Sequence, residues 1–290
     1  MTNKHEPEYR RISGAEMGGE RVLFHTDHLD IHDSTFNTGE SALKHCHDIR
    51  ATGCNFIGRY PIWHNRNVRV TGCDFGDDAR AAMWYDENIA LRNTVINAPK
   101  TLRECINVDL RNVRVTNGPE TLWMCRDVNA DGLVADGAEY IFMRSENLKI
   151  SGLKLHGKYS FQYVRNIEIH DSELYTKDAF WHAENITVYD SLVSGEYLAW
   201  HSRNLRLVRC RITGTQPLCY CDNLIMEDCT MDADADLAFE YSTVTATINS
   251  DVTSVKNPTS GRIEVRGHIG ETIIDEFCPD PAATVILSDR

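Results

Sequence analysis

The sequence predicts an all-β protein folded as a right-handed parallel β-helix, or solenoid, of about 11–13 coils with about 19–21 residues in each coil. Three observations support this prediction. A polar residue followed by an apolar, a polar and an apolar residue recurs eleven times, at intervals of 19 to 21 residues. Apolar and polar residues alternate in these segments, as they do in half-buried strands. Glycine, asparagine or aspartate follows most of the strands, where a sharp corner requires it.

We call the polar residue that opens each repeat the anchor. Stacked asparagine amides can hydrogen-bond from coil to coil, so we expect a ladder at a bend that water reaches poorly. This structural role accounts for the asparagine column without any ligand. Eight of the eleven anchors are asparagine, and the anchors are His28, Asp48, Asn67, Asn88, Asn107, Asp127, Asn147, Asn166, Asn185, Asn204 and Asn223.

Columns of apolar residues define the expected core. Positions one, three and eight after the anchor are apolar in almost every coil, as in Val68, Val70 and Phe75. Leucine-rich repeats share this period, but they need a leucine consensus and often a helical segment, and no stretch here has helical spacing. The column five residues before the anchor is also apolar and should face the core, and it contains Leu43, Ile62, Met83, Leu102, Leu122, Phe142, Phe161 and Phe180.

The repeat also sets the organisation that we expect for a single domain. Residues 1–20 precede the repeat and form an N-terminal cap, and residues 21–241 form the coils. The pattern weakens after Phe239. Residues 242–290 therefore form degenerate last coils and a C-terminal cap, which protects the open end from edge-to-edge association.

Composition limits the classes of partner and the compartment. The formal net charge is −13, which disfavours binding to nucleic acid or to an anionic membrane. The polar N-terminus leads into no apolar secretory segment, and no stretch has the 18 or more apolar residues of a membrane span. We therefore expect a cytoplasmic protein without a cofactor.

Ten cysteines fall mainly into two columns of the repeat. Buried cysteine behaves as a small apolar residue and suits a tight corner, and without secretion we expect thiols rather than disulfides. One column contains Cys54, Cys73, Cys210 and Cys229, and the other contains Cys46, Cys105, Cys125 and Cys221.

The columns three, four and eight residues before the anchor indicate a functional surface, and we call these three columns together the aromatic edge. All five tryptophans stand four residues before an anchor, and histidine or tyrosine often stands three residues before it. Charged residues occupy the column eight residues before the anchor. Aromatic rings beside arginine, lysine and carboxylates are typical of carbohydrate sites. The candidate ligand-binding residues are Arg59, Trp63, His64, Arg80, Trp84, Tyr85, Arg103, Lys158, Tyr163, Lys177, Trp181 and Trp200.

We therefore expect the aromatic edge to bind a saccharide or a similar polyhydroxylated small molecule, in which uronates would contact the basic residues. Should there be catalysis, of a polysaccharide lyase or glycoside hydrolase kind, the acid–base candidates are Glu104, Asp178, His182 and His201. The loops are too short to enclose a cleft easily, which weighs against an enzyme.

Two alternatives stay open. His25, His45 and His64 share one column on successive coils. The alternative to a protein without a cofactor is therefore a metal ion bound by these three histidines. The aromatic edge could also be the contact surface of a non-catalytic scaffold, for another protein or for self-association as a homo-oligomer. Exposure discriminates between a ligand site and a partner surface. A concave, open row of tryptophans favours a ligand, a flat dry patch favours a partner, and buried tryptophans exclude both.

Several motifs of this chain are long enough to be specific, and they include Arg59-Tyr60-Pro61-Ile62-Trp63-His64, Arg80-Ala81-Ala82-Met83-Trp84-Tyr85, Thr176-Lys177-Asp178-Ala179-Phe180-Trp181-His182 and Gly214-Thr215-Gln216-Pro217-Leu218-Cys219-Tyr220-Cys221. These segments resemble the bacterial domain-of-unknown-function 3737 family. The resemblance extends over about residues 17–265 and implies a single-stranded right-handed β-helix of the pectin-lyase-like superfamily. It implies no activity, because the family is named for lacking an assigned one, and it offers no established functional residues.

Overall fold

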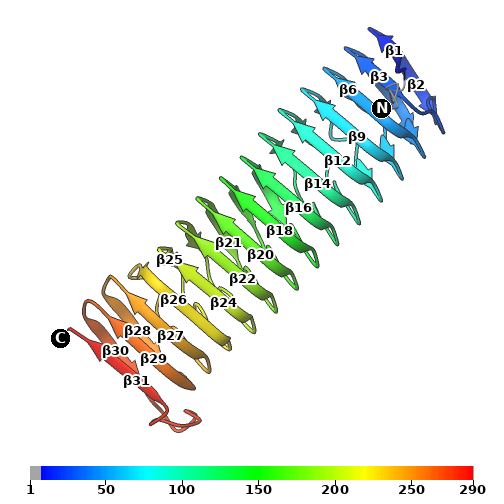
Figure 1. The fold of residues 1–290 in the computed structure, drawn as a ribbon. Helices are drawn as coiled ribbons and strands as arrows, with labels where there is room; N and C mark the ends of the chain where they lie inside the picture. Colours follow the sequence, from blue (N-terminus) through cyan, green and yellow to red (C-terminus); the bar gives the residue numbers. More distant parts are fainter. Residues whose placement is uncertain (1–7, 290) are drawn as a thin grey trace, which may run out of the picture. The chain divides into compact units, whose positions relative to one another are not determined.

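The computed structural model describes residues 8–289, and every regular element in them is a β-strand (Figure 1). The chain divides into two compact units, Met1–Val134 and Ala135–Arg290. Strand β17 (Val134–Glu139) contains the boundary between the units. Each unit consists of parallel strands that stack in register, so each unit is built as a solenoid.

The strands that contain or directly follow the anchors form the first column of the first unit, together with β1 (Arg10–Ser13), which precedes the first anchor. Val68, for example, faces Ile89 on the next strand, and Ile89 faces Val108 on the one after. Figure 1 shows these strands side by side. They are β1 (Arg10–Ser13), β3 (Leu29–His32), β6 (His47–Thr52), β9 (Arg66–Thr71), β12 (Glu87–Arg92), β14 (Ile106–Arg111) and β16 (Arg126–Asp131).

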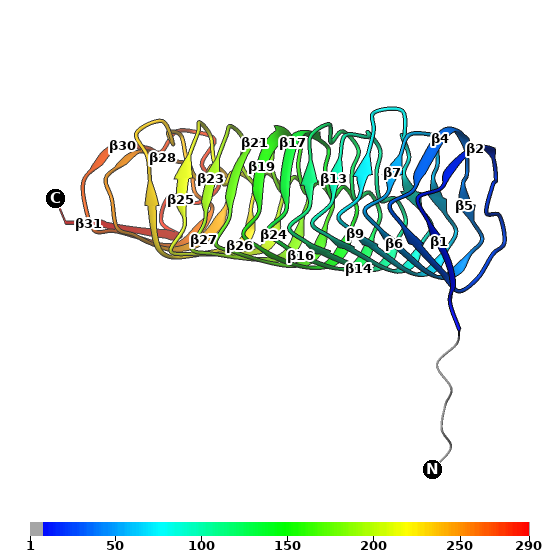
Figure 2. The ribbon, with the colours of Figure 1, turned by 90° about the horizontal axis from the view of Figure 1, so that it is seen from above.

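Shorter strands complete each coil of the first unit. A second column lies on the side opposite the first, as β4 and β7 do relative to β6 and β9 in Figure 2. Its members are β2 (Glu16–Glu20), β4 (Thr35–Glu40), β7 (Asn55–Phe56), β10 (Asp74–Phe75), β13 (Val95–Ile96) and β15 (Arg114–Val115). A three-stranded sheet carries part of the aromatic edge and consists of β5 (Leu43–Lys44), β8 (Ile62–Trp63) and β11 (Met83–Trp84).

The second unit repeats this arrangement. Its first column contains β18 (Glu146–Ser151), β20 (Arg165–His170), β22 (Glu184–Tyr189), β24 (Arg203–Val208), β26 (Asp222–Met231), β27 (Thr243–Ile248), β29 (Ser260–Val265) and β31 (Thr284–Ser288). Its second column contains β19 (Lys154–Lys158), β21 (Glu173–Lys177), β23 (Leu192–Ser194) and β25 (Arg211–Thr213). A separate two-stranded sheet pairs β28 (Val252–Lys256) with β30 (Ile269–Ile273).

The predicted all-β, right-handed parallel solenoid is confirmed, with about 15 turns in the described parts of the two units. This number exceeds the predicted 11–13 coils because backbone pairing continues where the sequence repeat is absent or weak. In the first unit β1 pairs with β3, and in the second unit β29 pairs with both β27 and β31. Across residues 8–289, no helix is both long and apolar enough to cross a membrane.

The predicted core columns are confirmed. The residues five positions before the anchors, from Leu43 to Phe180, are almost completely buried. Because successive coils are in register, identical side chains stack directly on one another. Phe36, Phe56 and Phe75 form such a stack in the first unit, with ring centroids 4.7 and 4.6 Å apart. The rings of Phe142, Phe161 and Phe180 stack at 4.8 and 5.0 Å in the second unit.

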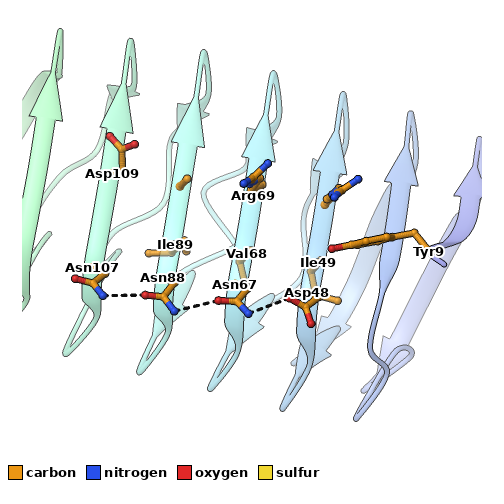
Figure 3. A pocket seen from close by; sticks show the side chains of 12 residues that line it. Tyr9, Asp48, Ile49, Asn67, Val68, Arg69, Asn88, Ile89, Asn107 and Asp109 are labelled. Carbon is orange, nitrogen blue, oxygen red and sulfur yellow. Dashed lines mark hydrogen bonds between the residues drawn. The ribbon is translucent and has the colours of Figure 1, made fainter. Parts of the chain in front are cut away.

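The asparagine ladder is present, but its environment differs from the expected one. In the first unit the Asn88 amide donates to Asn67 at 3.0 Å (Figure 3). In the second unit Asn185 donates to Asn166 at 3.0 Å. These side chains are exposed to solvent rather than shielded from it. All the described anchors adopt a left-handed backbone, with φ of 57° at Asn67. Asparagine therefore suits the position because it tolerates this conformation and can also pair with its neighbours.

The cysteines of the two columns do more than fill space in the core, because their sulfur atoms also take part in hydrogen bonds. A side-chain oxygen or sulfur at these corners accepts a backbone N–H of the preceding coil, as Cys73 Sγ does from Cys54 at 3.3 Å. Ser172 Oγ does the same for Leu153 at 3.1 Å. All ten cysteines are free, and nine of them are buried. Burial raises the pKa of Cys221 to about 11, so this thiol is protonated at neutral pH.

One of these corner columns places a carboxyl group in the core. Asp86 is 1% exposed, and its Oδ1 accepts the backbone N–H of Asn65 at 2.7 Å. Its Oδ2 has no hydrogen-bond partner within residues 8–289. Burial raises the pKa of Asp86 well above its usual value, which favours the neutral acid.

We predict that Asp86→Asn stabilises the protein at neutral pH. In the unfolded chain Asp86 ionises above about pH 3.9, whereas the folded protein keeps it protonated. The wild type therefore loses stability as pH rises from that value toward the raised pKa, by up to about 1.4 kcal/mol for each pH unit. Asparagine retains the Oδ1 acceptor and cannot ionise. Urea unfolding at several pH values should show a gain that grows with pH, with the exposed Asp74→Asn as the control. A gain that is independent of pH would contradict the prediction.

Candidate functional site

The tryptophans of the aromatic edge are half-buried and packed against one another and against cations. In the first unit the rings of Trp63 and Trp84 lie 5.1 Å apart at an angle of 35°. The Arg103 guanidinium lies between the indoles of Trp84 and Trp123, at 4.5 and 4.6 Å from their centroids. In the second unit Trp181 and Trp200 are 5.9 Å apart. The expected outward tryptophan row therefore exposes only part of each ring.

The histidines and tyrosines three residues before the anchors form the more exposed ladder. In the second unit His182 stacks on Tyr163 at 5.3 Å and on His201 at 4.9 Å. His201 in turn stacks on Tyr220 at 4.8 Å. The first unit has the equivalent ladder of His45, His64 and Tyr85, at 5.1 and 4.7 Å. The inner rings, His64, His182 and His201, have a stacked ring on each face, so they present ring edges to solvent.

The basic residues of the aromatic edge are mostly paired with carboxylates. Arg59 forms an ion pair with Glu40 on the preceding coil, and Lys177 contacts Glu196 on the following coil at 2.9 Å. Arg103 contacts Glu120 at 2.9 Å. Within the described residues no ion pair includes Arg80 or Lys158, and both side chains are exposed. The expected basic surface is thus largely neutralised.

A groove of about 390 Å³ in the second unit joins the ladder to charged residues. His182, His201 and Tyr220 line one side of it. Glu184, Arg203 and Asp222, which face one another in register on β22, β24 and β26, line the other. Burial and the neighbouring His182 lower the pKa of His201, which favours the neutral imidazole. The groove therefore offers hydrogen-bond donors and acceptors along both sides.

The four acid–base candidates do not form a hydrogen-bonded catalytic group. Glu104 belongs to the first unit, where its side chain is exposed. Asp178 is 6% exposed, and burial raises its pKa. Within the described residues no hydrogen bond links Asp178 to His182 or His201, and the two histidines meet only by stacking.

The structure offers no support for metal ligation on the histidine column. Among residues 8–289, no three or more histidine, cysteine, aspartate or glutamate side chains converge as metal ligands would. His25 and His45 both contact the Phe24 ring, and His45 and His64 are stacked with their planes 15° apart. The nitrogen lone pairs of stacked rings run parallel, so they do not meet at one point.

Sequence reasoning missed the charged side of the groove. The residue directly before the anchor alternates in charge on successive coils of the second unit, and this pattern was available as a signal. The alternating residues are Glu146, Arg165, Glu184, Arg203 and Asp222. Alternation lets each charge lie beside opposite charges in a parallel in-register sheet. The ring-on-ring stacking that covers the aromatic faces has no comparable signal in the sequence.

We predict that Arg103 stabilises the first unit through its position between two indoles. The side chain is 16% exposed, so its contacts are shielded from solvent. Lysine cannot reproduce the planar stacking, and Arg103→Lys should lower the free energy of unfolding by about 1–2 kcal/mol. Urea unfolding followed by tryptophan fluorescence measures this change. Arg59→Lys, at an exposed ion pair, is the matched control and should change stability by less than about 0.5 kcal/mol. Equal effects of the two substitutions would contradict the stacking role.

Comparison with solved structures gives only distant similarities. The tailspike protein gp49 from Pseudomonas phage LKA1 is 12% identical, with a TM-score of 0.37, over 85% of this chain and 46% of the tailspike chain. Trypsin-treated QnrB1, a plasmid-mediated fluoroquinolone resistance protein, is 15% identical, with a TM-score of 0.23, over 76% of this chain and 91% of its own. HetL, a pentapeptide repeat protein from Nostoc sp. strain PCC 7120, is 10% identical, with a TM-score of 0.22, over 89% of this chain and 88% of its own.

This chain thus spans less than half of the tailspike chain that it matches. The TM-scores are too low for these similarities to support any statement about function. No curated protein matches the chain at a significant level. One family model, described as protein of unknown function (DUF3737), matches residues 10–287. The match covers nearly the whole chain and agrees with the resemblance of its sequence motifs, so the chain belongs to the DUF3737 family.

Proposed function

We propose that this protein binds a saccharide, or a similar polyhydroxylated molecule, in the groove beside His182, His201 and Tyr220. The groove itself carries the proposal, because it places aromatic ring edges opposite Glu184, Arg203 and Asp222 within about 390 Å³. Carboxylate, guanidinium, imidazole and phenol groups together supply both donors and acceptors for hydroxyl groups. A volume in this range accommodates a small ligand. Kinship with pectin lyases, which the sequence resemblance implies, stays a prediction and supplies no activity.

Hydrogen bonding by ring edges, rather than stacking on ring faces, would hold the ligand. Stacking on a pyranose requires a free aromatic face, but His182 and His201 are covered on both faces by neighbouring rings. The Trp200 indole donates to the carbonyl of Gln216 at 2.8 Å, which fixes its orientation. The imidazole nitrogens and the tyrosine hydroxyl repeat at the strand spacing of about 4.8 Å. They therefore form a regular row of hydrogen-bonding groups.

The charges of the groove favour a neutral saccharide over an acidic one. Glu184 and Asp222 are two carboxylates, and Arg203 is the single permanent cation among the lining residues. Lys177, which was expected to hold uronates, is paired with Glu196. A uronate in the groove would therefore be repelled by two carboxylates and attracted by one arginine.

We predict saturable binding of neutral oligosaccharides, measured by tryptophan fluorescence. Trp200 lies 5.1 Å from Tyr220 and Trp181 lies 5.8 Å from His201, so both report on the groove. His201→Ala removes the imidazole and its hydrogen bond to the ligand. It should weaken binding about tenfold, because one hydrogen bond contributes about 1 kcal/mol to affinity. Uronate oligosaccharides should bind more weakly than the neutral ones.

His64→Ala is the matched control, since His64 occupies the same column and the same kind of stack in the first unit. It should leave binding unchanged. A flat fluorescence response to all saccharides, or equal losses in His201→Ala and His64→Ala, would refute the proposal. Circular dichroism of each variant separates loss of binding from loss of fold.

A second candidate function is that of a self-associating scaffold, and strand β31 favours it. In the described part of the chain β31 pairs only with β29, which leaves its other edge open. Val285 and Leu287 on this strand are 47% and 41% exposed, and Phe277 nearby in the sequence is 65% exposed. An open, apolar edge strand is a template for pairing with a second chain.

We predict concentration-dependent dimers that β31 mediates. Light scattering after size exclusion should show a doubled mass for the wild type and a monomeric mass for a variant carrying Val285→Lys and Leu287→Lys, because charges on an edge strand oppose pairing. Val95→Lys, an exposed position on β13 with strands on both sides, is the control and should leave the mass unchanged. A monomeric wild type at high concentration would contradict this function.

A further inference from the structure

The first unit has a larger groove of about 480 Å³ on the outer face of its first strand column. It lies over β6, β9, β12 and β14, and none of its lining residues belongs to the aromatic edge. Figure 3 shows the amide ladder from Asp48 to Asn107 along one side, with Arg69 and Asp109 farther along their strands and Tyr9 at one end. Nothing in the sequence repeat marks this position as a site.

Two arginines on adjacent strands of this groove lack an acidic partner. Arg50 on β6 faces Arg69 on β9 in register, and both side chains are exposed. Within residues 8–289 neither arginine forms an ion pair with a carboxylate. Like charges directly opposite one another on a sheet are destabilising. An anion bound between the two guanidinium groups would remove this repulsion.

Three carboxylates near this groove make their contacts with other groups. Asp30, which faces Arg50 from β3, contacts His32 at 3.0 Å. Asp48 accepts the Asn67 amide at 2.9 Å. Asp109 forms an ion pair with Arg92. None of the three forms an ion pair with Arg50 or Arg69.

Tyr9 orients one arginine for binding. The Arg50 guanidinium lies 3.9 Å from the centroid of the Tyr9 ring, stacked over its face. Tyr9 is held in turn by an edge contact with His28 at 5.7 Å. A stacked guanidinium keeps its N–H groups in its own plane, where they remain free for an oxyanion.

The next coil leaves room for the rest of a ligand. Ala90 follows Arg69 in register, so the row of long side chains is interrupted there. The amides of Asn67 and Asn88 line the groove beside this gap. Each amide uses one N–H in the ladder and keeps a second for a ligand. Asp109 lies beyond the gap and would repel a second anionic group.

We propose that this groove binds a small phosphomonoester, with the phosphate between Arg50 and Arg69 and a neutral, hydroxyl-bearing part over Ala90. A phosphomonoester carries a charge of about −1.5 to −2 at neutral pH, which matches two guanidinium groups, whereas a carboxylate matches only one. Arginine binds phosphate oxygens through paired N–H groups. The net charge of −13 opposes a nucleic acid as the source of the phosphate. This site is independent of the saccharide groove in the second unit.

Calorimetric titration of the full chain tests the proposal, with glucose 6-phosphate as the probe at constant ionic strength. Inorganic phosphate, glucose and glucuronate are the comparison ligands. Glucose 6-phosphate should bind at one site and at least about tenfold more tightly than each of them. Arg50→Gln and Arg69→Gln should each weaken binding at least about tenfold, and Tyr9→Leu several-fold.

Lys149→Gln is the matched control, because Lys149 occupies the same position after its anchor on β18 and is also exposed. It should leave the affinity unchanged, and circular dichroism confirms that each variant is folded. The proposal is overturned by an absence of saturable binding, by equal affinity for glucuronate, or by affinity that survives both arginine substitutions. Equal affinity for inorganic phosphate would overturn the assignment of the Ala90 gap to the organic part of the ligand.

Discussion

The in-register stacking of coils within each unit is the constraint on which the other features depend. Residues at equivalent positions of successive coils lie one strand spacing apart, about 4.8 Å. The side chains of one column therefore contact one another and must pack or pair favourably. Phenylalanine meets this condition by ring stacking, as from Phe36 to Phe75. Asparagine meets it because each amide donates to the amide oxygen of the preceding coil, as from Asn107 through Asn88 to Asn67. Cysteine and serine meet it at the corners by accepting the backbone N–H of the preceding coil.

Many charged residues meet the same condition by alternating in sign or by forming ion pairs. Glu184, Arg203 and Asp222 alternate in register, and Lys177 contacts Glu196 on the next coil. A column of one repeated charge would accumulate repulsion along the sheet. Like charges do face one another elsewhere, but a carboxylate is then close at hand: Arg92 faces Arg111, and Asp109 contacts both. Arg50 faces Arg69 beside a groove, and within residues 8–289 neither of them forms an ion pair. The missing carboxylate is what distinguishes this pair.

The columns of the core could be predicted from the sequence because burial depends on residue type and period alone. Leu43, Ile62 and Phe161 needed no more than their spacing to be assigned to the interior. The left-handed corners at Gly53 and Asn93 followed in the same way from residue type. The family also followed from motifs long enough to be specific.

The candidate site was less predictable because exposure and partners depend on side-chain geometry that the period does not contain. The sequence places Trp84 and Arg103 in one column, but not the guanidinium between two indoles. It places His182 and His201 on adjacent coils, but not their stacking, which covers the ring faces. Their left-handed backbone, with φ of 52° and 60°, is also unexpected for histidine. Since the described residues of this column share that conformation, it belongs to the architecture rather than to one site.

The strongest functional signals in such a fold are therefore departures from the repeat. Ala90 interrupts a row of long side chains, and Tyr9 enters the groove from before the first strand, where no period applies. In this groove the interruption provides the space, because Ala90 stands where neighbouring coils carry long side chains. The same reasoning separates the two ladders of the aromatic edge. The ladder of His45, His64 and Tyr85 repeats the stacking, and beside it the opposite charges of Arg66 and Glu87 form an ion pair at 2.8 Å. Stacking is thus common to both units, and we propose that the residues beside it, which differ between the units, determine which of them binds a ligand.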